Sequence, residues 1–162
     1  MCPENAPLKK GRRLAWCYGD LGVSLAIWLA VTQTQNAEWE NFAYHVFQHY
    51  ANRVSLSANA VLHSEICHGP AAIAMVFNRL YLSTNDPIFK TASTYWIEKT
   101  LDCGSFPDGI GGYKSIYGNK WIRDSTLLTG AAGIGLVLLS CLAKGTQNWD
   151  EIFLLQLALI YI

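Results

Sequence analysis

A glycine-led segment recurs three times along the chain, and this repeat constrains the fold more than any other feature. The copies open at Gly19, Gly69 and Gly130. In every copy a small residue follows the glycine by three positions and a β-branched residue comes next: Gly22 and Val23, Ala72 and Ile73, Gly133 and Ile134. Such self-similarity is typical of helical-repeat proteins, in which each repeat buries its apolar face against its neighbours.

The residues at each opening suit the start of a tightly packed helix. Glycine relieves crowding where a chain turns into a helix, and Pro70 stands where a first helical residue would be. Small residues one turn later let another helix approach closely. The segments that follow are apolar nearly all round, as expected of helices inside a protein. The sequence therefore predicts inner helices that open near residues 19, 69 and 130.

Amphipathic segments lie between the apolar ones. Residues 36–55 carry apolar side chains at spacings of three and four, which indicates a helix with one buried face. In residues 86–101, Asp86 is a plausible cap and Pro87 a plausible first helical residue. No strand pattern competes strongly with these helices. The prediction is an all-α chain in which outer amphipathic helices alternate with inner apolar ones.

A last helix and a long loop are predicted for two further segments. Residues 149–162 are expected to form the last helix. Residues 103–120 are rich in glycine and are expected to form a long loop. Long loops in compact domains are often functional, and a flexible surface connection is the equally open alternative.

Composition excludes several classes of protein. Twelve basic residues balance twelve acidic ones with no sustained basic stripe, so nucleic acid is not an expected partner. Half of the chain is hydrophobic (51%), which argues against disorder. Residues 127–143 are interrupted by polar and small residues, and residues 152–162 fall short of the ~20 apolar residues of a spanning helix. We therefore expect no transmembrane segment.

The cysteines indicate the compartment. The chain has five of them, an odd number, and they lie far apart. Small disulfide-stapled scaffolds are denser in cysteine and usually carry an even number. We therefore predict free or metal-bound thiols in a reducing compartment, and a cytoplasmic protein.

Two of the three openings carry a cysteine two residues before the glycine. Cys17 precedes Gly19, and Cys67 precedes Gly69 with His68 between them. Repeats that pack side by side would bring the two cysteines together. Two thiolates and an imidazole suit zinc and leave a fourth position open, as in catalytic sites, and helix N-termini favour thiolates. On this chemistry alone, cysteines that act as buried apolar residues are an equally open alternative.

Other candidate ligands have simpler explanations. His45 and His49 are four residues apart on one helix, but no acidic residue lies between them, so the zinc-protease pattern is absent. We interpret both as solvated residues of an outer helix. His63 and Glu65 lie near Cys67. We interpret them first as polar loop residues and second as groups that orient a metal ligand.

The repeat openings resemble those of the lanthionine synthetase C family, the lantibiotic cyclases. The residues that carry the resemblance are Trp16-Cys17-Tyr18-Gly19 with Gly22, Cys67-His68-Gly69 with Ile73-Ala74, Gly112-Tyr113-Lys114, and residues 127–135. The match runs over nearly the whole chain in the right order. It implies an α/α toroid, in which a ring of inner helices is surrounded by outer ones, over residues 14–162. Residues 1–13 would be an N-terminal extension.

The resemblance also implies a site and a reaction. Cys17, Cys67 and His68 would be the three protein ligands of Zn²⁺. A cysteine of a dehydrated precursor peptide would take the open zinc position, lose its proton and add to dehydroalanine or dehydrobutyrine, which gives a thioether ring. Zinc would lower the pKa of the thiol and hold the nucleophile in place.

The chain departs from the family in two ways. Residues 69–72 lack a second glycine that family members usually keep. Family members are also longer, and their earlier portion supplies the rest of the ring with an acid–base histidine and aspartate that we cannot place here. We therefore expect an incomplete ring and unknown catalytic residues, and we expect zinc binding by this chain alone more than catalysis. Its partner would be the missing N-terminal half or a dehydratase.

Two other functions are compatible with the same sequence. A related zinc enzyme could use the same ligands to add glutathione to dehydrated residues. Alternatively, the chain could be a non-catalytic helical-repeat interaction module whose cysteines are incidental.

Overall fold

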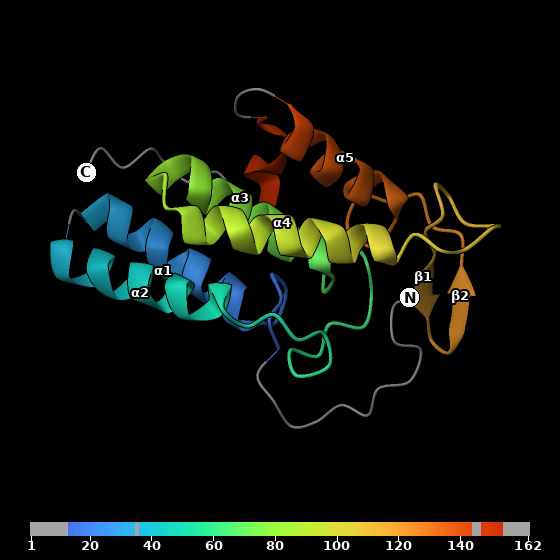
Figure 1. Ribbon diagram of the computed structural model, residues 1–162, viewed down its shortest axis with the longest axis horizontal. Helices are drawn as coiled ribbons and strands as arrows, with labels where there is room; N and C mark the ends of the chain where they lie inside the picture. The colour runs from blue at the N-terminus through green and yellow to red at the C-terminus, as the bar shows by residue number, and fades with distance from the viewer. Residues whose placement is uncertain (1–12, 35, 144–146, 154–162) are drawn as a thin grey trace.

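The computed structural model describes residues 13–34, 36–143 and 147–153, and this part of the chain is mostly helical (Figure 1). The elements are α1 (Asp20–Thr34), α2 (Ala37–Ala51), α3 (Pro70–Thr84), α4 (Pro87–Asp102), β1 (Ser115–Tyr117), β2 (Lys120–Ile122), α5 (Ala131–Leu142) and the 3₁₀ helix η1 (Trp149–Phe153). The predicted all-α, helical-repeat class is confirmed. Among the described helices, none is long and apolar enough to cross a membrane.

The three inner helices begin where the repeat predicts. Helices α1, α3 and α5 start directly after Gly19, Gly69 and Gly130. Helix α1 packs against α2, and α3 packs against α4, so the first two repeats are helical hairpins (Figure 1). Helix α3 also contacts α5 and lies at the centre of the molecule.

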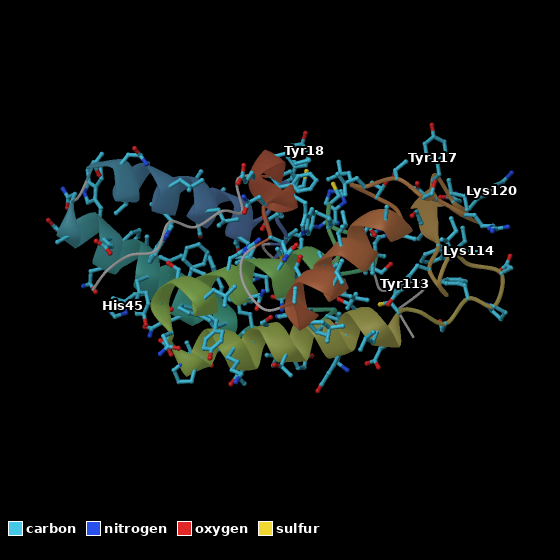
Figure 2. All side chains as sticks on the ribbon, turned by 90° about the horizontal axis from the view of Figure 1, so that it is seen from above. Tyr18, His45, Tyr113, Lys114, Tyr117 and Lys120 are labelled. Carbon is cyan, nitrogen blue, oxygen red and sulfur yellow. The ribbon has the colours of Figure 1, made fainter. Side chains whose placement is uncertain are left out.

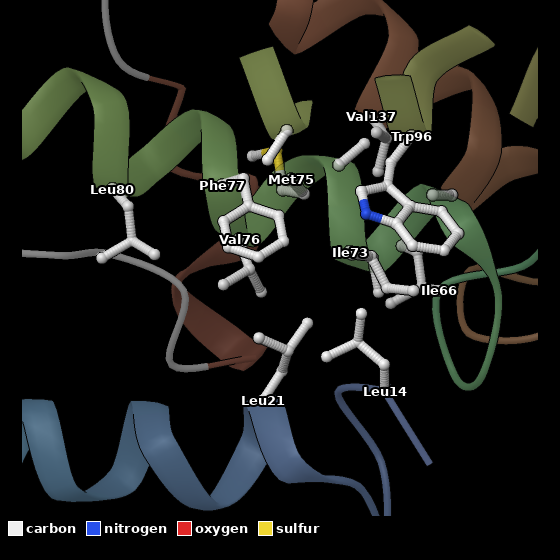
Figure 3. Packing of buried hydrophobic residues seen from close by; sticks show 14 of the residues in the cluster. Leu14, Leu21, Ile66, Ile73, Met75, Val76, Phe77, Leu80, Trp96 and Val137 are labelled. Atoms are coloured by element: carbon white, nitrogen blue, oxygen red, sulfur yellow. The ribbon is translucent and has the colours of Figure 1, made fainter. Parts of the chain in front are cut away.

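The core is built around α3, which explains why this helix is apolar on all sides. Ile73, Met75 and Phe77 are fully buried, as is Trp96 from α4. Figure 3 shows that side chains from outside α3 close the same cluster: Leu14, Leu21, Ile66 and Val137. Burying each large apolar side chain is worth about 1.5–3 kcal/mol, so the packed neighbours of α3 hold the repeats together.

Capping residues set the starts of the outer helices. The Asn36 side chain accepts hydrogen bonds from two backbone amides at the start of α2. Asp86 accepts one from Ile88 at the start of α4, which confirms the predicted cap. Asp86 also accepts a 2.5 Å hydrogen bond from the Tyr44 hydroxyl, and so links α2 to α4. Burial, followed by this bond and the carboxylate charge, raises the pKa of Tyr44 to about 12.

The segment 103–120 is more ordered than the predicted loop. Strands β1 and β2 pair antiparallel, with Tyr117 opposite Lys120, so the hairpin turn has two residues. The first of them, Gly118, has φ +61°, which glycine adopts without strain. The Ser115 hydroxyl donates to the Thr129 carbonyl at 2.5 Å, which anchors the hairpin to the third repeat opening.

A buried ion pair joins η1 to α3. The Arg79 guanidinium donates to both carboxylate oxygens of Asp150, at 2.7 and 2.8 Å. It also donates to the Gln147 carbonyl. Asp150 is fully buried and Arg79 is 5% exposed. The helix predicted at 149–162 is described only as far as Phe153, and the rest of that prediction lies outside the described residues.

Candidate metal centre

Backbone hydrogen bonds hold the three repeat openings side by side. The Cys17 amide donates to the Cys67 carbonyl at 3.1 Å, and the Cys67 amide donates to the Leu128 carbonyl, also at 3.1 Å. The three residues hold equivalent positions, each two residues before its glycine. The packing predicted from the repeat is therefore confirmed, and it brings the two cysteines together.

Each opening turns so tightly that its glycine has no room for a side chain. A Cβ atom on Gly19 would lie 2.5 Å from the Ala15 carbonyl oxygen. A Cβ atom on Gly69 would lie 2.4 Å from the Glu65 carbonyl oxygen. The Gly69 amide donates to that same carbonyl at 2.9 Å, which closes the turn that carries Cys67 and His68. The glycines of the repeat thus give the cysteine loops their shape.

Three donor atoms converge at this point. The ligand atoms of Cys17, Cys67 and His68 all lie within 4.8 Å of one another. The Cys67 sulfur is 3.5 Å from Nε2 of His68. Cys67 is buried, whereas Cys17 and His68 are half-buried, so one side of the cluster is accessible. Two sulfurs and one imidazole nitrogen are a donor set that fits zinc with one coordination position left for a substrate.

The electrostatics of the cluster favour a cation. Burial raises the pKa of Cys67 to about 12, and the hydrogen bond and charge of Cys17 and the charge of Glu65 act in the same direction. The positive charge of Arg13 opposes them. Without a cation the Cys67 thiol therefore stays protonated at neutral pH. A divalent cation among the three donors would reverse this balance, because it stabilises the thiolate directly.

Zinc affinity is expected to rise steeply with pH. The pKa of Cys67 lies near 12, so the thiol is protonated throughout pH 6–8 and metal binding must release that proton. Each released proton makes the apparent affinity rise about tenfold per pH unit below the thiol pKa. Competition with a chelator of known pH dependence, at pH 6, 7 and 8, measures this slope. A flat profile would show that Cys67 is not a ligand.

Two residues beside the cluster were not predicted as parts of a site. Nothing in the sequence marked Arg13 as part of a site, but it is half-buried and its charge acts on Cys67. Tyr18 is 93% exposed and has φ +50°. In the sequence, Tyr18 was marked only by its place in the motif Trp16-Cys17-Tyr18-Gly19. Figure 2 shows Tyr18 projecting from the molecule on the same side as Tyr117 of the hairpin.

An open hollow of about 630 Å³ lies next to Tyr18. Its walls are the apolar side of α1 together with Arg13, Trp16, Asp20 and Phe153. Trp16 holds one edge in place, because its indole donates to the Phe153 carbonyl at 3.0 Å and the two rings pack edge to face. The candidate metal centre thus borders a surface that can receive part of a substrate.

The remaining candidates lie elsewhere. His45 and His49 are exposed on α2 and do not belong to the cluster of Cys17, Cys67 and His68. Among the described residues, that cluster is the only group of three or more side chains that could hold a metal ion. Glu65, in contrast, lies next to the site, with a carboxylate oxygen 3.8 Å from Nδ1 of His68.

The other cysteines differ from each other. Cys141 is half-buried, and burial raises its pKa to about 11, as expected of an inert packed thiol. Cys103 is disulfide-bonded, so the prediction of free or metal-bound thiols is wrong for this residue. That bond does not involve Cys17 or Cys67, which are both free.

The chain was compared with known protein families and with curated proteins. The family model described as lanthionine synthetase C-like protein matches residues 3–154. No curated protein matches the chain.

Proposed function

Since the chain belongs to the lanthionine synthetase C-like family, we propose that it is a zinc-dependent cyclase that forms thioether rings in peptides. The reaction joins a peptide cysteine to a dehydroalanine or dehydrobutyrine, as in lantibiotic biosynthesis. The observation that carries the proposal is the convergence of Cys17, Cys67 and His68 within 4.8 Å. The substrate is a dehydrated precursor peptide, and a dehydratase that supplies it is the expected partner in the cytoplasm.

The described residues have separate tasks in this proposal. Cys17, Cys67 and His68 would hold the metal and leave its fourth position toward the accessible side. Bound zinc would supply the Lewis acidity that lowers the pKa of an incoming thiol. The hollow lined by Trp16 and Phe153 would receive the peptide beside its reacting cysteine.

The chemistry balances within the substrate. The cysteine sulfur loses its proton and forms a bond to Cβ of the dehydrated residue. The C=C double bond of that residue is lost, and its Cα gains a proton. The product is therefore an isomer of the substrate. Its mass is unchanged and it has one free thiol fewer.

The test uses the full zinc-loaded chain and a peptide with one dehydroalanine and one cysteine. We expect the enzyme to give a product of unchanged mass that no longer reacts with a thiol-alkylating reagent. Uncatalysed addition is the background, and the Cys67→Ser variant is measured beside it. A zinc-loaded chain that does not exceed this background would contradict the proposal.

Glutathione offered in the same reaction separates the rival functions. The glutathione-adding alternative predicts a product heavier by one glutathione, with the peptide thiol retained. The interaction-module alternative predicts neither product, and it also predicts that a chelator leaves the melting temperature unchanged, whereas removal of a bound zinc ion would lower it.

A further inference from the structure

A buried carboxylate lies behind the candidate ligand His68. Glu65 is only 5% exposed. Its Oε1 atom is 3.8 Å from Nδ1 of His68, while Nε2 of the same ring is 3.5 Å from the Cys67 sulfur. The two ring nitrogens of His68 therefore face different partners, one anionic and one in the thiol cluster.

The backbone places Glu65 in this position. The carbonyl of Glu65 accepts the Gly69 amide at 2.9 Å, so residues 65–69 form a closed turn. In such a turn, side chains three residues apart lie on the same side, as in a helix. The Glu65 and His68 side chains are thus neighbours because of the turn that the repeat glycine makes possible.

A metal-loaded site would explain a carboxylate at this place. Burying a charge is costly unless it is paired. A divalent cation among the three donors would supply that pairing through the imidazole, because the carboxylate then polarises a neutral ring that binds the cation.

We propose that Glu65 is a positioning residue, whose carboxylate accepts the Nδ1–H of His68 and aims Nε2 at a cation held by Cys17 and Cys67. The 3.8 Å separation between Oε1 and Nδ1 is longer than a hydrogen bond, so this role requires that the two groups move together when the cation binds. This role rests on the proposed zinc function. It adds to that function that Glu65 selects the tautomer of His68 with the proton on Nδ1. In this role, Glu65 would touch neither the metal nor the substrate.

The test compares Glu65→Gln and Glu65→Ala with the parent chain and with Glu98→Gln, which changes an exposed glutamate on α4. Zinc affinity is measured by chelator competition. Loss of the carboxylate is expected to weaken binding about 10–100-fold in Glu65→Ala. Glu65→Gln retains an acceptor oxygen and is expected to lose less, and Glu98→Gln is expected to match the parent.

Cobalt spectroscopy separates positioning from a general effect on stability. In Co²⁺-loaded Glu65→Ala, the thiolate charge-transfer bands should persist, because both cysteines remain. The ligand-field bands should shift, because the imidazole is no longer held. Nitrogen-15 spectra of the zinc-loaded parent should show His68 protonated at Nδ1.

The outcomes distinguish this inference from the proposed function. A zinc-binding parent whose Glu65→Ala variant keeps the parental affinity and cobalt spectrum would overturn the role of Glu65 alone. A parent that binds no zinc would overturn the proposed function and this role with it. Circular dichroism checks folding, and the isosteric Glu65→Gln variant answers the question if Glu65→Ala does not fold.

Discussion

Zinc binding is expected to fall by about two orders of magnitude or more in Cys67→Ser. Zinc sites with four protein ligands contribute about 10–16 kcal/mol, so loss of one ligand costs roughly 3 kcal/mol, or ~10²-fold in affinity. Cys67 has the largest expected effect because its sulfur is buried and its backbone is held between the other two repeat openings. Elemental analysis after dialysis gives zinc per chain, and chelator competition gives the affinity.

The matched control is Cys141→Ser, which alters a half-buried free thiol outside the cluster. It should retain the parental zinc content, whereas Cys17→Ser should lose zinc as Cys67→Ser does. Retention of zinc by both Cys17→Ser and Cys67→Ser would place the metal elsewhere. A reduced, folded parent without zinc would instead favour the interaction-module function.

Asp150→Ala is expected to lower the free energy of unfolding by about 3–5 kcal/mol, because it leaves the guanidinium of Arg79 buried without its carboxylate. The Gln147 carbonyl, which also accepts a hydrogen bond from that guanidinium, is neutral. Urea unfolding followed by circular dichroism measures the change. The loss is a large fraction of the stability of a typical domain.

The exposed pair of Lys99 and Asp102 provides the control for this experiment. Asp102→Ala removes a similar contact on the surface, where solvent screens it, so it should leave stability nearly unchanged. The double variant Arg79→Met with Asp150→Leu should recover much of the lost stability, because no charge is then left unpaired. If Asp150→Ala costs no more than Asp102→Ala, η1 contributes little to the fold.

The starts of the helices could be predicted because they depend on local chemistry. Glycine and proline at the repeat openings, and Asp86 at α4, act within one turn of their own positions. The hairpin of β1 and β2 was missed because its strands have three residues each, too few for an alternating pattern. The pairing of Arg79 with Asp150 was missed because 71 residues separate them and neither sits in a recognisable motif.

The residues of the candidate site could likewise be predicted only in part. Cys17 and Cys67 could be predicted as neighbours because equivalent positions in stacked repeats come together. The effect of Arg13 on the site could not be predicted, because basic residues that precede a helix are usually solvated. Only the tertiary structure places the charge of Arg13 beside Cys67. For Glu65, the sequence left loop polarity and ligand orientation open, and its burial against His68 favours the second.

The hydrogen bonds between the repeat openings bear on how the metal is acquired. Leu128 occupies the same position as the two cysteines, and its carbonyl accepts from the Cys67 amide just as the Cys67 carbonyl accepts from the Cys17 amide, although Leu128 has no sulfur. These bonds are therefore made by the main chain alone and do not depend on a bound ion. Folding would come first and metal loading last, into donors already gathered. Loss of the ion would then leave an intact scaffold, ready to be refilled.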